Sequence, residues 1–263
     1  MNDHLRARNV LYEVVADQTP IKDAFLLLGK IETGFGNHAA AAKVLRAGSN
    51  AFPTDIQLAC AYGHALLSIG AAGRFATELR EKLSRLRREV ALTDSSYFTI
   101  EGVRARFELL FGDRKLGEQL LARVVASDMA PVEAMILQTE LFLESGRILP
   151  ARLQLRRAME SSSRDPKLYA LMARSYILSG EEEEIGWAVQ LATIACQRSY
   201  WQNPECVRAL MEAYERTGDE AAGLLVRKQL IQISIHRELK LDEIRKLRVK
   251  IEKLGELTRD AET

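Results

Sequence analysis

The sequence predicts an all-α protein built from stacked helix-turn-helix hairpins, on three observations. Alanine, leucine, glutamate and arginine, which are strong helix formers, dominate the composition, and only 6 prolines interrupt it. No long stretch alternates valine, isoleucine or threonine with polar residues, as a half-buried strand would. Glycines that follow helical runs recur at near-constant spacing, which indicates an internal repeat.

Composition narrows the class of protein. A chain of 263 residues with 47% hydrophobic residues can fill a core, and its formal net charge of +1 lacks the positive field of general nucleic-acid binders. The first residues hold no apolar run of signal-peptide length, and no segment approaches the roughly 20 apolar residues of a membrane span. We therefore expect a cytoplasmic protein that neither binds nucleic acid nor inserts into a membrane.

Six glycines end the helical runs, with separations of 34, 42, 34, 34 and 38 residues. The two longer separations exceed 34 by eight and four residues. These are close to two turns and one turn of helix, at about 3.6 residues per turn. A glycine suits the left-handed backbone that closes one helix before the next begins. The six are Gly36, Gly70, Gly112, Gly146, Gly180 and Gly218.

The elements follow in order from this spacing. Residues 1–20 contain a helix over residues 3–16 that should cap the array, and residues 21–233 form about six hairpins. The second helix of each hairpin carries an apolar stripe after the glycine, and prolines such as Pro53 stop it. The first helix carries a mostly small residue seven positions before the glycine, where two helices approach closely. These positions are Gly29, Gly63, Ala105, Thr139, Ala173 and Met211.

The repeat pattern resembles the tetratricopeptide repeat (TPR) family. The first unit, FLLLGKIETGFGNHAAAAKVLRAGSNAFP, has Gly29, Ala41, Leu45 and Pro53 at that family's spacings. The resemblance covers residues 21–233 and implies a right-handed α-solenoid whose first helices line a concave groove. It also implies a chaperone-like scaffold or adaptor for protein-protein interaction, which in bacteria often serves secretion, pilus or surface-polymer assembly.

Three units depart from the pattern. In the second, Phe75 stands where a small residue would be expected. In the third, the apolar set Ile100, Val103, Phe107 and Leu110 runs one residue out of phase with its glycine, which predicts a turn one residue longer. In the fifth, four consecutive glutamates at 181–184 stand where the extra residues fall. We interpret them as an added first turn of the second helix, where exposed amides and the helix dipole favour carboxylates. A contact with a basic partner at this edge is the lesser alternative.

Residues 234–263 predict an amphipathic helix and a tail. Ile244, Leu247, Ile251 and Leu254 follow one another at alternating three- and four-residue steps, as in a short heptad seam. Two interpretations stand for this helix. It either caps the last hairpin or joins two copies of the chain in a homodimer.

Patterns that carry catalysis are scarce. None of the 4 histidines belongs to an HExxH cluster, and no glycine-rich phosphate loop is present. Cys60, Cys196 and Cys206 form no CxxC pair, so they indicate small buried hydrophobes and no zinc site or disulfide framework. We therefore predict a non-enzyme with no catalytic residue, metal or cofactor.

Groove positions in the resembled family lie six and three residues before the turn glycine. The row six before is polar in every unit, from Lys30 to Glu212, and the row three before is aliphatic in the middle four units. A third row, ten before, is mostly small or apolar. The predicted protein-binding groove consists of His64, Leu67, Arg106, Leu109, Ile136, Glu140, Leu143, Arg174, Ile177 and Glu212.

Polar and aliphatic rows side by side suit a peptide or helix with one apolar edge and mixed charges. The aliphatic residues also fit another interpretation, in which they pack against a neighbouring helix or against the C-terminal helix folded into the groove. We predict a non-catalytic adaptor that binds a partner peptide or helix in this groove. The alternative is a regulatory repeat protein that senses a peptide or metabolite.

Overall fold

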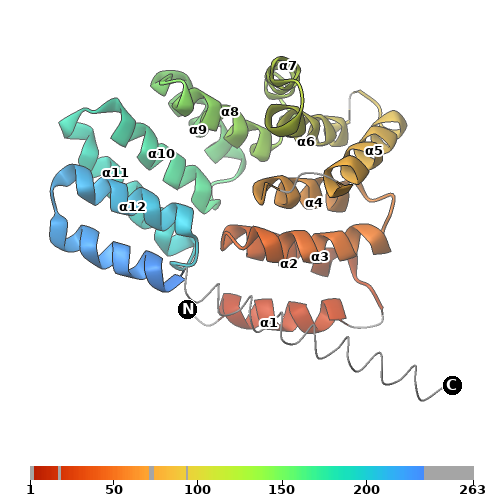
Figure 1. Cartoon of the computed structure of the whole chain (residues 1–263), viewed down its shortest axis with the longest axis horizontal. Coiled ribbons are helices and arrows are strands. Elements are labelled where there is room, and N and C mark those ends of the chain that lie inside the picture. Colours follow the sequence, from red (N-terminus) through yellow and green to blue (C-terminus); the bar gives the residue numbers. More distant parts are fainter. Residues whose placement is uncertain (1–2, 17–18, 71–73, 93, 234–263) are drawn as a thin grey trace.

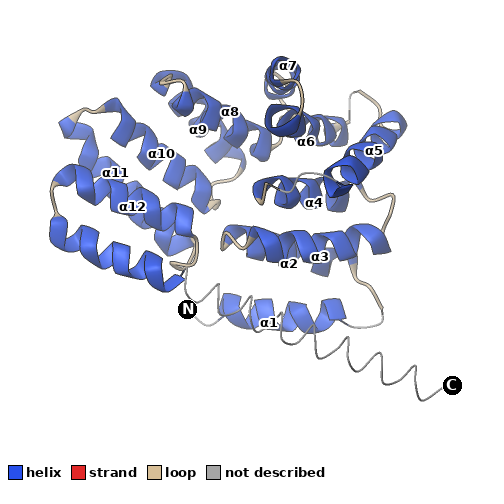
Figure 2. Ribbon diagram, in the orientation of Figure 1, coloured by secondary structure: helices blue, strands red, loops and turns tan. Residues whose placement is uncertain are grey.

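The structure is a computed structural model, which describes residues 3–16, 19–70, 74–92 and 94–233. Within these ranges every regular element is helical and no strand occurs (Figure 2), which confirms the all-α prediction. None of the described helices is both long and apolar enough to span a bilayer. The helices are α1 (Asp3–Ala16), α2 (Lys22–Gly34), α3 (His38–Ala51), α4 (Ile56–Ser68), α5 (Arg74–Glu89), α6 (Ser95–Phe111), α7 (Arg114–Val125), α8 (Val132–Glu144), α9 (Ile148–Ser161), α10 (Pro166–Ser179), α11 (Glu182–Arg198) and α12 (Pro204–Thr217). A further helix covers residues 220–233.

The helices are arranged along a curved arc (Figure 1). Each helix from α1 to α12 packs against the next one in the chain. The even-numbered helices α2 to α12 also contact one another in succession. They therefore form a continuous row, and residues at equivalent positions of this row become neighbours in space.

The two ends of the arc meet. Asn203 Nδ2 donates a hydrogen bond to the carbonyl oxygen of Gly34, at 3.2 Å, across 169 residues of sequence. Beside it, the rings of Phe35 and Tyr200 meet edge to face with their centroids 6.3 Å apart. The turn between α2 and α3 is thus joined to the loop before α12, and the arc closes on itself at this point.

Short polar side chains fix where several helices begin. Asp55 Oδ1, for example, accepts a hydrogen bond from the backbone N–H of Leu58 at 2.8 Å. Such a cap satisfies one of the amides left free in a helix's first turn, and its loss costs about 1 kcal/mol. The capping residues are Asp55, Asp94, Asp113, Asp165 and Asn203.

Five of the six turn glycines adopt the left-handed conformation, with φ between 63° and 73°, whereas Gly112 has φ −126°. Only Gly112 and Asp113 separate α6 from α7, against three residues between α8 and α9, so the prediction of a longer turn is wrong. The cause is Glu108, whose carboxylate accepts the N–H of Asp113 at 3.1 Å. At the turn after α8, the equivalent N–H, from Arg147, is bonded instead by a backbone carbonyl.

The acidic run at 181–184 lies at the start of α11. Glu181 is the N-cap and the next three glutamates form the first turn of a helix of 17 residues, against 14 for α9. Glu184 accepts hydrogen bonds from Arg152 at 2.9 and 2.5 Å and from Ser179 at 2.7 Å. These hydrogen bonds lower the pKa of Glu184. The interpretation as an added helical turn is confirmed.

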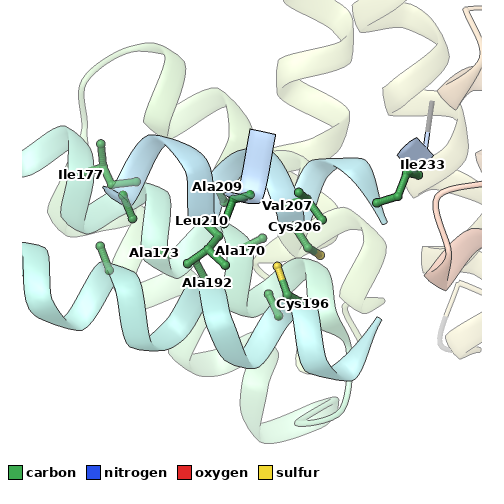
Figure 3. Packing of buried hydrophobic residues seen from close by; sticks show 14 residues of the cluster. Ala170, Ala173, Ile177, Ala192, Cys196, Cys206, Val207, Ala209, Leu210 and Ile233 are labelled. Carbon is green, nitrogen blue, oxygen red and sulfur yellow. The ribbon is translucent and has the colours of Figure 1, made fainter. Parts of the chain in front are cut away.

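Small residues permit close helix packing where the sequence predicts it. A Cβ atom at Gly29 would lie 2.5 Å from the side chain of Leu45, and one at Gly63 would lie 2.6 Å from Val103. The buried apolar side chains form several clusters along the arc. In the cluster of Figure 3, Ala173, Ala192 and Leu210 lie where α10, α11 and α12 meet.

The two ends of the chain differ in what the structure describes. α1 packs on α2, with Leu11, Tyr12 and Val15 against the first core cluster. The predicted C-terminal helix at 234–263, with the candidate seam of Ile244, Leu247, Ile251 and Leu254, lies outside the described residues.

Candidate functional site

The row of even-numbered helices brings five polar side chains together inside the arc. His64 comes from α4, Arg106 from α6, Glu140 from α8, Lys167 from α10 and Glu205 from α12. We call these five residues the inner cluster. The charge of Lys167 on α10 acts on His64 on α4, so the cluster reaches across the closed arc.

Short ion pairs and hydrogen bonds hold the inner cluster in place. Lys167 Nζ lies 2.7 Å from Glu140 Oε1 and 3.9 Å from Glu205 Oε2. Arg106 donates to the backbone carbonyl of His64 at 3.2 Å and to Ser68 Oγ at 3.0 Å. His64 Nε2 is buried and makes no hydrogen bond with the described residues. Each cation is thus fixed by neighbours on other turns or helices.

Burial shapes the protonation states of this cluster. Burial lowers the pKa of His64 to about 3, and the nearby charges of Arg106 and Lys167 act in the same direction. Burial would also lower the pKa of Lys167, but the carboxylates of Glu140 and Glu205 outweigh it and raise that pKa. The side chain of Lys167 lies in a recess of the protein, and 28% of its surface stays exposed to solvent. At neutral pH the histidine is neutral and the lysine charged.

A pocket of about 330 Å³ opens beside the cluster, on α8, α10 and α12. Three cations and three carboxylates surround it, so its charges balance. Arg174, Arg208 and Glu205 are exposed, whereas Ala170, Leu171 and Ala209 are buried in its wall. The lining residues are Glu140, Lys167, Ala170, Leu171, Arg174, Glu205, Arg208, Ala209 and Glu212. We call this the inner pocket.

The predicted groove residues separate into two groups. The polar ones, His64, Arg106, Glu140, Arg174 and Glu212, belong to the inner cluster or line the inner pocket.

The aliphatic ones do not form an accessible edge of a groove. Leu67, Ile136, Leu143 and Ile177 are buried, with 2 to 7% of their surface exposed, and each belongs to a core cluster. Leu109 is half-buried and packs against the core formed with α7. These side chains pack against neighbouring helices, which is the other interpretation given for the row of Leu67, Leu109, Leu143 and Ile177.

Three charged pocket residues were missed by the sequence prediction: Lys167, Glu205 and Arg208. Arg208 lies in the row ten before the glycine, where most units carry small or apolar residues. The other two lie thirteen residues before their glycines, in a row that is polar in all six units. Thirteen and six differ by seven residues, about two helical turns, so the two polar rows share a face. That row reads Asp23, Gln57, Thr99, Glu133, Lys167 and Glu205.

Reactive groups are few near the inner pocket. Burial raises the pKa of Cys60, Cys196 and Cys206 to about 12, so their thiols stay protonated and weakly nucleophilic at neutral pH. All three are buried, as the sequence predicts. Across the described ranges, no three histidine, cysteine, aspartate or glutamate side chains gather as a metal site would require. The arrangement suits recognition by charge pairs.

Comparison of the chain with models of known protein families and with curated proteins gave no match.

Proposed function

We propose that the chain is a TPR-like adaptor that holds a segment of a partner protein in the inner pocket and catalyses no reaction. In this proposal α2, α4, α6, α8, α10 and α12 are the first helices of about six repeats. They line the concave side of a right-handed solenoid. The observation that carries the proposal is the convergence of six charged side chains of both signs, from three successive units, on one pocket.

The chemistry of the pocket defines the partner segment. Arg174 and Arg208 are exposed and offer donors to carboxylates, while Glu205 accepts from a lysine or arginine. The buried aliphatic row leaves no apolar anchor at the surface, so the segment is charged and contains residues of both signs. A balanced pocket repels a uniformly acidic or uniformly basic segment at one of its sides, and this repulsion provides specificity.

Selection from a display library of random short peptides on the immobilised full chain tests the proposal. We expect enriched peptides that carry both acidic and basic residues. Their affinity should fall at least about tenfold in the Arg174→Glu/Arg208→Glu variant, because two favourable charge contacts become repulsive. Both arginines are exposed and make no ion pair with the described residues, so the fold should be retained.

The matched control is Lys43→Glu/Arg156→Glu, which makes the same change of charge at exposed positions on α3 and α9. Affinity within about threefold of wild type is expected for this control. Enriched peptides that bind both double variants as well as wild type would show that the inner pocket is not the binding site.

A second candidate function follows from the size of the pocket. A volume of about 330 Å³ falls within the range of small-molecule sites, roughly 300 to 1,000 Å³. Balanced charge of both signs suits a zwitterion such as an amino acid or a dipeptide, as in a sensing protein. Thermal stabilisation by such compounds, lost in the Arg174→Glu/Arg208→Glu variant and without any enriched peptide, would favour this function over the adaptor.

A further inference from the structure

A second concave site lies between α5, α6 and α7, and it shares no residue with the inner pocket. Its volume is about 470 Å³. The floor includes Leu116 and Leu120 of α7. The charged groups around it are Arg87, Arg88, Arg104, Arg123 and Glu101. We call this site the arginine hollow.

The charges of the arginine hollow do not balance. Four guanidinium groups surround a single carboxylate, so three positive charges have no counter-charge within the hollow. The chain as a whole carries a formal net charge of only +1, so this excess is local. A local excess of positive charge in a concave surface concentrates anionic partners there.

Glu101 fixes two of the arginines. Its side chain is 2% exposed, and its Oε1 accepts from Arg87 Nε at 2.6 Å and from Arg104 Nη1 at 2.5 Å. The guanidinium of Arg87 also lies over the ring of Tyr97, 5.3 Å from its centroid. A guanidinium has five N–H donors, so one shared carboxylate leaves most donors of this pair unused. Both side chains stay about one third exposed and can reach a ligand.

The other two arginines make no ion pair with an acidic group among the described residues. Within the same ranges, Arg88 donates only to the backbone carbonyl of Ser84, one helical turn earlier, at 3.3 Å. Arg123 makes no ion pair or hydrogen bond with the described residues, and both side chains are exposed. The hollow therefore combines a rigid pair of guanidinium groups with two adaptable ones.

We propose that the arginine hollow binds an acidic segment of a partner protein. Carboxylates of the segment pair with the four guanidinium groups, since arginine and carboxylate match in a two-pronged geometry. An aliphatic side chain of the segment covers Leu116, which is 40% exposed. Such an open wall would enclose little of a small anion, which favours a short acidic peptide as the occupant.

Fluorescence anisotropy with a labelled short peptide, rich in glutamate and containing one leucine, tests this proposal on the full chain. We expect saturable binding that weakens as salt rises from about 0.05 M to about 0.5 M. The Arg88→Glu/Arg123→Glu variant should lose affinity by about tenfold or more, because two favourable charge contacts become repulsive. Its fold should be retained, because neither arginine holds a structural carboxylate. The same peptide with glutamine for each glutamate should not bind.

The matched control is Arg85→Glu/Lys115→Glu, which reverses two exposed charges on the same helices, outside the hollow. Its affinity should stay within about threefold of wild type. The inner-pocket variant Arg174→Glu/Arg208→Glu should also retain the acidic peptide, so this test is independent of the proposed adaptor function.

Three outcomes would overturn the proposal. The first is an absence of saturable binding by wild type, and the second is an equal loss of affinity in the hollow variant and its control. The third is displacement of the peptide by inorganic pyrophosphate at a concentration at which added chloride of equal ionic strength has no effect. That result would assign the hollow to a phosphorylated small molecule.

Discussion

The inner pocket and the arginine hollow both contain arginine and glutamate side chains, but in different proportions. Both are concave, and both gather charged side chains from three helices. The inner pocket is lined by three cations and three carboxylates, and two of these carboxylates, Glu140 and Glu205, already form ion pairs with Lys167. The hollow has four cations and only Glu101. We therefore propose that the inner pocket discriminates between ligands by their pattern of charge, and that the arginine hollow attracts ligands by the sign of their charge.

The two sites also differ in the turn glycines of the units where they lie. The inner pocket lies on α8, α10 and α12, where the turn glycines are 34 and 38 residues apart and left-handed. The hollow lies at the unit with the 42-residue separation. There the turn glycine, Gly112, is not left-handed, and the carboxylate of Glu108 accepts the N–H of the next residue. Units with left-handed turn glycines continue one surface from helix to helix, whereas the unit without that turn carries a second surface with its own charge.

The largest effect should come from the apolar layer behind the inner pocket. Ile177 is 7% exposed and its neighbour Leu178 is 46% exposed. Ile177→Asp should reduce the free energy of unfolding by about 4 kcal/mol, because it buries a carboxylate without a partner. Leu178→Asp should cost no more than about 0.5 kcal/mol. Denaturant titration checks both, and equal losses would show that Ile177 is not part of the core.

A smaller effect separates the two structural carboxylates. Glu101→Gln removes the only anion between Arg87 and Arg104 at a site 2% exposed, and should cost about 2 kcal/mol. Glu140→Gln should cost about 1 kcal/mol, since Glu140 is 29% exposed and Glu205 still neutralises Lys167. Thermal unfolding at one pH measures both variants. A larger loss of stability in Glu140→Gln than in Glu101→Gln would contradict the larger structural contribution of Glu101.

Lowering the pH should destabilise the protein through His64 of the inner cluster. The folded-state pKa of His64, about 3, lies below the unfolded value of about 6.5. Between these values the unfolded chain binds more protons, so stability falls as the pH falls from about 6.5 toward 3 and is unaffected above that range. From pH 7 to pH 5.5 the loss is about 1 kcal/mol.

His64→Gln should remove this part of the pH dependence. The measurement is the free energy of unfolding of both proteins at several pH values, with Arg88→Glu/Arg123→Glu as the control that keeps the wild-type slope. If His64→Gln leaves the slope unchanged, the histidine is not held neutral in the inner cluster.

The smallest change in the free energy of unfolding is expected for the variant of the arginine hollow in the absence of peptide. In the Arg88→Glu/Arg123→Glu variant, relief of repulsion among the arginines opposes the loss of positive charge in the last turns of α5 and α7. The free energy of unfolding should therefore stay within about 0.5 kcal/mol of wild type. A loss above about 1 kcal/mol would make these arginines structural and remove the reason to regard them as available to a ligand.

Much of the fold could be predicted from the sequence because it depends on local patterns. The glycine spacing and the small residues such as Gly29 and Gly63 report turns and close contacts that the structure has. The turn after α6 could not be predicted this way. It depends on a side chain, Glu108, that takes the place of a backbone acceptor, and glutamate carries no turn signal of its own.

The candidate site was predictable only in part. A residue three positions after the polar row is rotated by about 60° around the helix, at roughly 100° per residue, and so turns toward the neighbouring helix. That rotation buries Leu67, Leu143 and Ile177. The arginine hollow left no periodic signal, because its arginines come from three successive helices and occupy no shared position of the repeat.

The central claim is that the inner pocket and the arginine hollow are separate sites that recognise different charge patterns. Hydrogen–deuterium exchange of the full chain with each peptide, the display-selected mixed-charge peptide and the glutamate-rich peptide, tests it directly. We expect slower exchange in α8, α10 and α12 with the mixed-charge peptide, and in α5, α6 and α7 with the glutamate-rich peptide. Protection of the same helices by both peptides would contradict it.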